Sequence, residues 1–164
     1  MRMEHIYTPW RMQYFDRDKK NPACAFCEAL KSADSDGNLV VARGERVFVI
    51  LNLYPYTSGH LMVVPNEHCS DFSVLDAEVV AEMMRYAQKA LRVLTDLYQP
   101  QGFNMGINLG AAAGAGIAAH LHLHIVPRWG GDANFMSVIG DTRVIPEAME
   151  TTYLRVREAW NQAE

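Results

Sequence analysis

Short apolar runs rich in β-branched residues follow one another between residues 39 and 65. They are "LVVAR" at 39–43, "RVFVILN" at 46–52 and "HLMVVP" at 60–65, and their composition is typical of β-strands. A turn at Gly44 separates the first two runs, the loop "LYPYTSG" follows the second, and Pro65 ends the third. Strands joined by such short connections predict an antiparallel meander.

The longest helical pattern starts after Asp76, a residue type that caps helix N-termini. Pro100 and Gly102 end the pattern. Apolar residues recur between these limits at three- and four-residue steps, at Val79, Val80, Met83, Met84, Ala87, Ala90, Leu91, Leu94 and Leu97. This stripe predicts a long amphipathic helix that packs on the core or forms a dimer face.

Two further strands and a second helix complete the pattern. The strands are "FNMGINL" at 103–109 and "HLHLHIV" at 120–126. Pro146 begins a C-terminal helix whose apolar contacts are Leu154, Val156 and Trp160. The sequence therefore predicts one α+β domain over residues 1–164, with about five mainly antiparallel strands. We expect an irregular segment at 1–38, a core with one long central helix at 39–146, and a C-terminal helix at 147–164.

Composition and charge narrow the range of partners. The chain has 164 residues and a formal net charge of −4, which predicts no surface for duplex nucleic acid or an anionic membrane. The start "MRMEHIYTPWRMQYF" lacks the apolar core of a signal peptide. No apolar stretch approaches the roughly 18 residues that span a bilayer. We therefore expect a cytoplasmic protein that has no membrane partner.

The stretch "HLHLHIVPRW" at 120–129 has a histidine at every second position, His120, His122 and His124. In a regular strand these three side chains share one face, while the apolar residues between them pack on the other. Neighbouring imidazoles would then lie about 6.5–7 Å apart. That spacing is too wide for all three to bind one zinc ion at about 2 Å. A row of imidazoles along a chain of phosphates fits this spacing better, and a partly solvated polar strand face is the alternative.

Histidine chemistry and the preceding loop both favour a phosphate-bearing substrate. An unperturbed pKa of about 6.5 leaves a neutral, nucleophilic imidazole at neutral pH, and a protonated neighbour can donate to an oxyanion. The loop "GAAAGAGIAA" at 110–119 runs directly into the histidines. Glycine and alanine allow close approach of the backbone, whose successive N–H groups can bind phosphate oxygens.

These residues resemble the histidine-triad (HIT) nucleotide hydrolases and transferases, whose signature alternates histidine with apolar residues. "VILNLYPYTSGHLMVVPNEH" and "GFNMGINLGAAAGAG" resemble further segments of that family. "YTPWRMQYF" and "RWGGDANFMSVIGDTRVIP" resemble the flanks of a bacterial branch related to diadenosine polyphosphate phosphorylases. The likeness covers roughly residues 6–146.

The resemblance implies roles for particular residues. All three triad histidines would be catalytic: His122 would attack the α-phosphorus of a nucleotide, and water or phosphate would resolve the nucleotidyl-histidine. His124 would contact the phosphate and leaving-group oxygens. The implied nucleotide-binding set is Asn52 for the ribose, Asn108 with the backbone of Ala115 and Gly116 for the phosphates, and Trp129 near the site.

Two departures from the family pattern lie just before the triad. The loop "GAGIAA" lacks the Gln, Ser or Thr whose side chain often binds phosphate in this family, so it offers only backbone donors. Ala119 stands where many relatives carry an acidic residue. These departures bear on the choice of substrate and on protonation of the leaving group more than on the nucleophile.

Cys24 and Cys27 form a C-x-x-C pair, the spacing of a zinc knuckle or a redox pair. A redox role would need a preceding strand and a helix that starts at the first cysteine, whereas "KKNPACAFC" has the composition of a loop. The remaining zinc ligands are open among His5, His60, His68, Cys69 and one triad histidine. The zinc-bearing members of the resembling family imply a closed structural site made of Cys24, Cys27, His68 and His120.

The resemblance implies an enzyme that transfers or hydrolyses a nucleotidyl group. The favoured reaction is phosphorolysis of diadenosine tetraphosphate by a homodimer, with a divalent cation accompanying the nucleoside polyphosphate or dinucleotide substrate. One alternative is a hydrolase of dinucleoside polyphosphates or adenosine phosphoramidates. The other is a nucleotide-binding interaction module without turnover.

Overall fold

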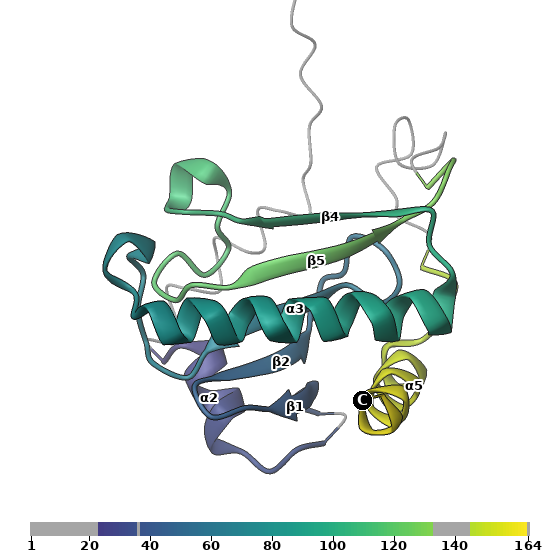
Figure 1. The fold of residues 1–164 in the computed structure, drawn as a ribbon, viewed down its shortest axis with the longest axis horizontal. Helices are drawn as coiled ribbons and strands as arrows, with labels where there is room; N and C mark the ends of the chain where they lie inside the picture. Colours follow the sequence, from purple (N-terminus) through teal and green to yellow (C-terminus); the bar gives the residue numbers. More distant parts are fainter. Residues whose placement is uncertain (1–22, 36, 133–144, 164) are drawn as a thin grey trace, which may run out of the picture.

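The computed structural model describes residues 23–35, 37–132 and 145–163. Five strands form one antiparallel sheet in these residues (Figure 1). They are β1 (Val40–Arg43), β2 (Val47–Leu51), β3 (Leu61–Pro65), β4 (Gly102–Ile107) and β5 (Leu123–Arg128). Their order across the sheet is β1-β2-β3-β5-β4. The predicted meander is confirmed for β1 to β3, and the insertion of β5 leaves β4 as an edge strand.

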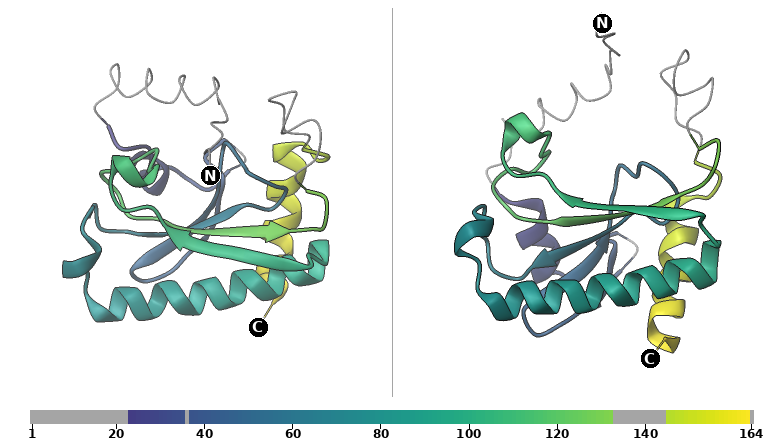
Figure 2. Two further views of the ribbon diagram at one scale, coloured as in Figure 1. Left: turned by 90° about the horizontal axis from the view of Figure 1, so that it is seen from above. Right: turned by 45° about the horizontal axis from the view of Figure 1, so that its top comes forward.

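Helix α3 (Ala77–Tyr98) covers one face of the sheet, as both views of Figure 2 show. It begins as predicted, because the Asp76 side chain accepts a hydrogen bond from the Glu78 N–H at 2.7 Å. Its buried apolar residues are Val79, Met83, Ala87, Ala90, Val93 and Leu94. The stripe is narrower than predicted, since Met84 is 46% exposed. Within the described ranges, no helix combines the length and the apolar character needed to cross a bilayer.

Helix α5 (Met149–Gln162) contacts α3 and β1 at the side of the sheet. Val156 and Trp160 are buried as predicted. The prediction for Leu154 is wrong, since its side chain is 62% exposed and the neighbouring Tyr153 is buried in its place. The helix therefore presents Val156 and Trp160 to the core as predicted, with Tyr153 in place of Leu154.

The expectation that residues 1–38 are irregular is wrong for α2 (Ala25–Lys31). This helix has no side-chain cap and buries only Phe26, so the usual sequence signals of a helix are weak. It lies on the face of the sheet opposite α3, near the short 3₁₀ helix η3 (Ala111–Ala113) (Figure 2). A second 3₁₀ helix, η2 (Phe72–Val74), precedes α3. The division of the chain at residues 38 and 146 stays a prediction.

Candidate active site and metal centre

The triad segment enters the sheet later than its pattern indicated. Strand β5 begins at Leu123, so His120 and His122 lie just before it and only His124 lies within it. The ring centroids of His122 and His124 are 4.7 Å apart, closer than the spacing predicted from a regular strand. The prediction that all three histidines belong to one strand is wrong, because pairing with β3 starts only at Leu123. The apolar residues between the histidines are buried, as predicted.

His122 is held in one tautomer by the backbone of its neighbour. Its Nδ1 lies 2.8 Å from the carbonyl oxygen of His120. Since a carbonyl can only accept, Nδ1 carries the proton and donates. The lone pair of the neutral ring is then on Nε2, the nitrogen remote from the backbone. This arrangement prepares Nε2 as a nucleophile.

His124 is held in the opposite tautomer by His60. His60 Nε2 lies 3.0 Å from His124 Nδ1. The Tyr56 N–H donates to His60 Nδ1 at 3.1 Å, so Nδ1 of His60 is an acceptor and its Nε2 carries the proton. His60 therefore donates to His124 Nδ1, and the proton of neutral His124 is on Nε2. That Nε2 is buried and has no hydrogen-bond partner in the described part of the chain, which leaves an N–H donor for a substrate oxygen.

Burial sets the charge of these imidazoles. It lowers the pKa of His122, while the hydrogen bond to the His120 carbonyl acts in the opposite direction. Burial lowers the pKa of His124 to about 4, and the neighbouring His122 adds to this shift. Both rings are therefore neutral at neutral pH. A neutral pair offers a lone pair and an N–H donor side by side.

His60 contacts the triad in a way that the sequence did not reveal, since it was considered only as a candidate metal ligand. It is fully buried and belongs to the connection between β2 and β3. Its partner on β5 is set by register, because Met62 pairs with His124. The sequence signal was a histidine at the start of a predicted strand. The register needed to interpret that signal is a long-range property that the local pattern does not contain.

Phe26 was also missed, and it joins the N-terminal helix to the triad. Its ring centroid lies 5.1 Å from that of His122 and 5.4 Å from that of His120. It also packs edge-on against Phe48 of β2. The only buried residue of α2 therefore contacts the proposed nucleophile directly.

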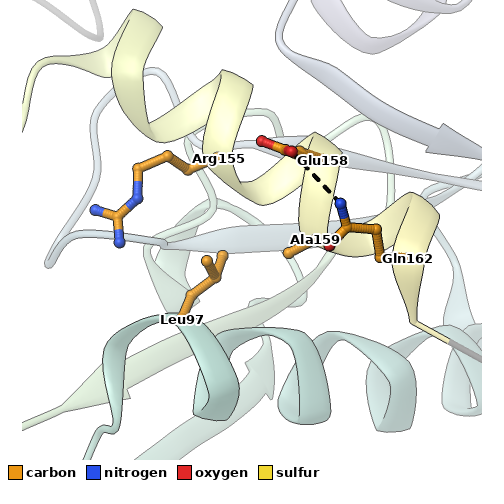
Figure 3. A pocket seen from close by; sticks show the side chains of 5 residues that line it. All are labelled: Leu97, Arg155, Glu158, Ala159 and Gln162. Carbon is orange, nitrogen blue, oxygen red and sulfur yellow. Dashed lines mark hydrogen bonds between the residues drawn. The ribbon is translucent and has the colours of Figure 1, made fainter.

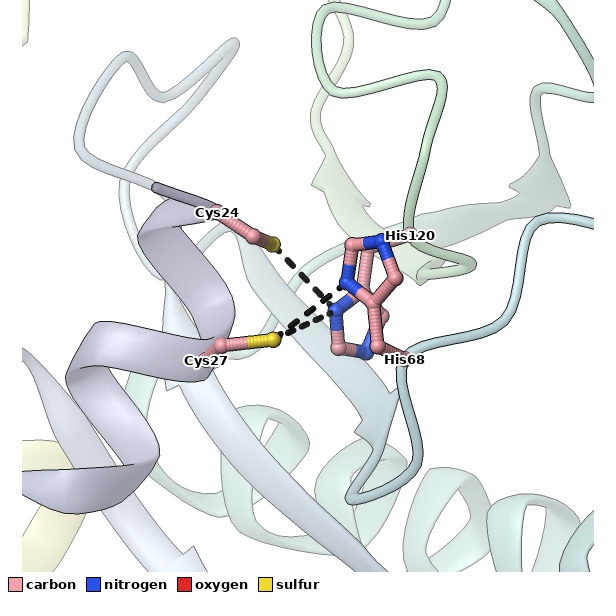
Figure 4. Close-up of side chains that lie close together, drawn as sticks. All are labelled: Cys24, Cys27, His68 and His120. Atoms are coloured by element: carbon pink, nitrogen blue, oxygen red, sulfur yellow. Dashed lines mark hydrogen bonds between the residues drawn. The ribbon is translucent and has the colours of Figure 1, made fainter. Parts of the chain in front are cut away.

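Four side chains converge beside the triad, from α2, the β3–η2 loop and the segment before β5 (Figure 4). They are Cys24, Cys27, His68 and His120, and their ligand atoms all lie within 4.8 Å of one another. His120 Nδ1 lies 3.3 Å from Cys24 Sγ and 3.6 Å from Cys27 Sγ. His68 Nδ1 lies 3.3 Å from Cys27 Sγ.

These distances fit a shared metal ion better than they fit isolated thiol hydrogen bonds. Two ligands at about 2.3 Å (S) and 2.0–2.1 Å (N) in a tetrahedron lie about 3.5 Å apart. His120 Nε2 lies 2.9 Å from the Pro65 carbonyl oxygen, so Nε2 is protonated and the lone pair of Nδ1 points at the sulfurs. A backbone partner of this kind orients metal-bound histidines. The structure thus brings together the four residues that the family resemblance implied, and of the other candidates His5 lies outside the described residues.

The helical context of the cysteines differs from the sequence expectation. Cys24 is the N-cap of α2, and Cys27 lies in its first turn. A helix starting at the first cysteine was one of two conditions set for a redox pair, so that part of the argument against a redox role is wrong. Residues before 23 are not described, so the other condition is untested.

The residues implied to bind nucleotide differ in how close they lie to the triad histidines. Asn108 directly follows β4, whose last residue Ile107 pairs with Leu123, the residue after His122. The Asn52 side chain accepts from the Tyr54 N–H at 3.0 Å and lies 3.4 Å from His60 Nδ1. Asn52 is thus close to the histidines but already engaged within the protein.

The loop and Trp129 agree less well with their implied roles. The Ala115 N–H donates to the Gly110 carbonyl at 3.4 Å, so it is used within the loop, and Gly116 next to it is half-buried. Trp129 follows the far end of β5, five residues beyond His124 and about 16 Å along the strand. Its indole N–H donates to the Tyr98 carbonyl at 3.4 Å. Within this chain, Trp129 is not brought to the histidines.

A separate shallow groove lies between α3 and α5 (Figure 3). It is lined by Leu97, Arg155, Glu158, Ala159 and Gln162. Its lining contains no histidine or cysteine, and Gln162 donates to Glu158 at 3.4 Å along α5. The groove is therefore distinct from the site built by the histidines.

Comparison with known proteins identifies the family of this chain. Residues 35–131 match the HIT domain. The chain belongs to the HIT family. It is 45% identical to a Mycobacterium tuberculosis protein named AP-4-A phosphorylase, over 96% of this chain and 85% of that protein. It is 30% identical to the Bacillus subtilis protein named Protein hit, over 70% of this chain and 77% of that protein.

Solved structures share the fold. A zinc-bound histidine triad family protein from Mycobacterium smegmatis superposes with a TM-score of 0.68 and 31% identity, over 86% of this chain and 95% of that one. A Plasmodium falciparum diadenosine triphosphate hydrolase superposes with a TM-score of 0.60 at 16% identity, over 85% of this chain and 96% of that one, which is evidence for the fold alone. The predicted α+β fold of the HIT type is confirmed.

Proposed function

We propose that this protein is a HIT-type nucleotidyltransferase that cleaves diadenosine tetraphosphate with inorganic phosphate, giving ATP and ADP. The observation that carries the proposal is the pairing of two neutral imidazoles with opposite tautomers, His122 with a lone pair on Nε2 and His124 with a proton there. The similarity to the M. tuberculosis protein named AP-4-A phosphorylase supports this substrate.

The chemistry follows from the tautomers. His122 Nε2 attacks the α-phosphorus, the bond from that phosphorus to the bridging oxygen breaks, and ATP leaves. His124 Nε2–H donates a hydrogen bond to the leaving oxygen, where negative charge develops. The His122 ring becomes cationic, and its Nδ1–H bond to the His120 carbonyl strengthens. Inorganic phosphate then attacks the nucleotidyl-histidine and releases ADP.

The binding residues support this reaction in part. Asn108, directly after β4, is suited to a phosphate oxygen, and ribose binding by Asn52 requires its present hydrogen bonds to be exchanged. Phosphate binding by the backbone of Ala115 and Gly116, and a contact from Trp129, stay predictions. A divalent cation accompanying the substrate is a further prediction.

The test is incubation of the protein with diadenosine tetraphosphate, with and without inorganic phosphate. Phosphate-dependent formation of equal amounts of ATP and ADP is the expected result. Formation of AMP and ATP without phosphate would instead assign a hydrolase that uses water at the same intermediate. Binding without turnover would assign a nucleotide-binding module, for which the lack of side-chain donors in "GAGIAA" is the supporting feature.

We also propose that Cys24, Cys27, His68 and His120 hold a structural zinc ion. The spacing of the four ligand atoms supports this site, as does the similarity to a zinc-bound HIT protein. When bound, zinc would tie α2 to the triad segment. Metal analysis of the purified protein should give one zinc per chain, and Cys24→Ser should lose it. A wild-type protein purified without stoichiometric metal would contradict the assignment.

A homodimer formed through β4 is the third proposal. β4 is an edge strand, and such strands present unpaired backbone groups to a partner. Met105 on β4 and Leu109 after it are 39% and 52% exposed. Light scattering should give twice the chain mass, and Met105→Lys should shift the protein towards monomer. A cytoplasmic location stays a prediction, consistent with reduced thiols at the metal site.

A further inference from the structure

The turn Cys24-Ala25-Phe26-Cys27 takes part in two sites at once. Its two cysteines face His120 and His68 (Figure 4). The phenylalanine between them packs on the rings of His120 and His122. Any rearrangement of this turn therefore acts on the metal ligands and on the nucleophile together.

We propose that Cys24 and Cys27 are a reversible thiol–disulfide pair whose oxidation by a peroxide releases the metal and disturbs His122. The proposal rests on the metal centre and nucleophile assigned above. Disulfides join Cα atoms about 4.4–6.8 Å apart, and the Sγ atoms of Cys24 and Cys27 already lie within 4.8 Å of one another. Both thiols are partly exposed, so a small oxidant can reach them.

The redox step is balanced by hydrogen peroxide. One thiolate attacks a peroxide oxygen and becomes a sulfenic acid while the other oxygen leaves as water. The second thiolate attacks that sulfur, the S–S bond forms, and a second water leaves. In sum, two zinc-bound thiolates, one peroxide and two protons give one disulfide, one zinc ion and two waters. Two electrons pass from sulfur to oxygen.

The coupling to the nucleophile follows from the contacts. His120 presents Nδ1 to both sulfurs and accepts from His122 Nδ1 through its carbonyl oxygen. Loss of the metal removes one of the two interactions that hold the His120 ring, the other being its hydrogen bond to the Pro65 carbonyl. Closure of the disulfide also turns the segment that carries Phe26. Both changes loosen the hydrogen bond that sets the tautomer of His122.

The experiment treats the zinc-loaded protein with hydrogen peroxide and then with dithiothreitol. Trypsin should yield a peptide of residues 21–31 that contains both cysteines, whereas Cys69 lies on another peptide. The expected result is loss of two hydrogens from this peptide and release of one zinc per disulfide, both reversed by dithiothreitol. Turnover should fall about tenfold or more, the size of effect typical when the groups that orient a site are lost.

Two variants and one NMR measurement serve as controls for this experiment. Cys69→Ser should behave like the wild type, since within the described residues its thiol donates to the Asp71 carbonyl at 3.3 Å and is not part of the cysteine–histidine cluster. Cys24→Ser should form no reversible disulfide. The ¹⁵N spectrum of the histidines should show a changed His122 signal after oxidation, whether or not the protein turns over substrate. Cysteines that stay reduced, or that form their disulfide with Cys69, would overturn the redox pair, and an unchanged His122 signal would overturn the coupling.

Discussion

The two faces of the sheet are covered by different kinds of buried side chain. The face under α3 is closed by aliphatic side chains, among them Met83 and Leu94, which make no hydrogen bonds through their side chains and tolerate exchange for residues of similar volume. The opposite face, with α2 and the loop before β5, buries His60, His120 and His122. Each of these rings has a directed partner.

Because of this difference, substitution of a buried residue should have a different consequence on each face. On the α3 face a lost side chain leaves a cavity, whose cost appears in stability. On the histidine face, loss of a hydrogen-bond partner allows the ring proton to move to the other nitrogen of the imidazole. The result is a lower rate of turnover. Substitutions on the two faces should therefore separate stability from turnover.

The largest effect is expected from His122→Gly. It removes the proposed nucleophile, so phosphate-dependent turnover of diadenosine tetraphosphate should fall at least about 10⁴-fold, the scale of loss seen for covalent nucleophiles. Nucleotide binding should change little, because the other binding groups remain. Steady-state kinetics with equilibrium binding measures both. Retention of wild-type turnover would remove His122 from the mechanism.

On the α3 face the matched pair is Met83→Ala and Met84→Ala. Met83 is 1% exposed and Met84 is 46% exposed, although both belong to the predicted stripe. Met83→Ala should cost about 2–5 kcal/mol of unfolding free energy, and Met84→Ala at most about 0.5 kcal/mol. Urea unfolding checks this. Turnover per folded molecule should be unchanged in both, and equal costs would mean that the helix face is wrongly placed.

His60 tests the tautomer argument on the other face. His60→Leu removes the donor to His124 Nδ1, so kcat should fall about 10- to 100-fold, as when a group that orients a site is lost. His60→Gln keeps an N–H donor near the position of Nε2 and should recover part of the loss. A purely structural role would give both variants the same kcat per folded molecule.

The smallest effect is a pH dependence of stability. The folded pKa of His124 is about 4, below the unfolded value of about 6.5. The unfolded chain thus binds more protons between these pH values, and stability rises with pH up to about 6.5 and is then flat. This one group contributes at most about 1.4 kcal/mol per pH unit. Urea unfolding of metal-free protein at pH 5 and pH 7.5 should show a smaller difference for His124→Gln than for the wild type, and equal differences would contradict the shift.

The sequence predicted the α3 face more completely than the histidine face. The limits of α3 follow from a local cap and a periodic pattern, and the sheet strands follow from β-branched runs. The start of β5 at Leu123 and the link from His60 to His124 depend on strand register, which local patterns do not specify. Helix α2 depends on the burial of Phe26 against the triad, a contact between distant parts of the chain. In the proposed metal site, Cys24 and Cys27 were found by their spacing, whereas His68 and His120 were selected from the other candidates only by the family resemblance.

The most direct test of the central claim is to trap the nucleotidyl-enzyme. Excess protein is mixed with diadenosine tetraphosphate in phosphate-free buffer, quenched in base and mapped by mass spectrometry. The account predicts one AMP adduct, located on His122, formed together with ATP and discharged as ADP when phosphate is added. An adduct on another residue, or phosphate-dependent ADP formation by the His122→Gly variant at the wild-type rate, would contradict it.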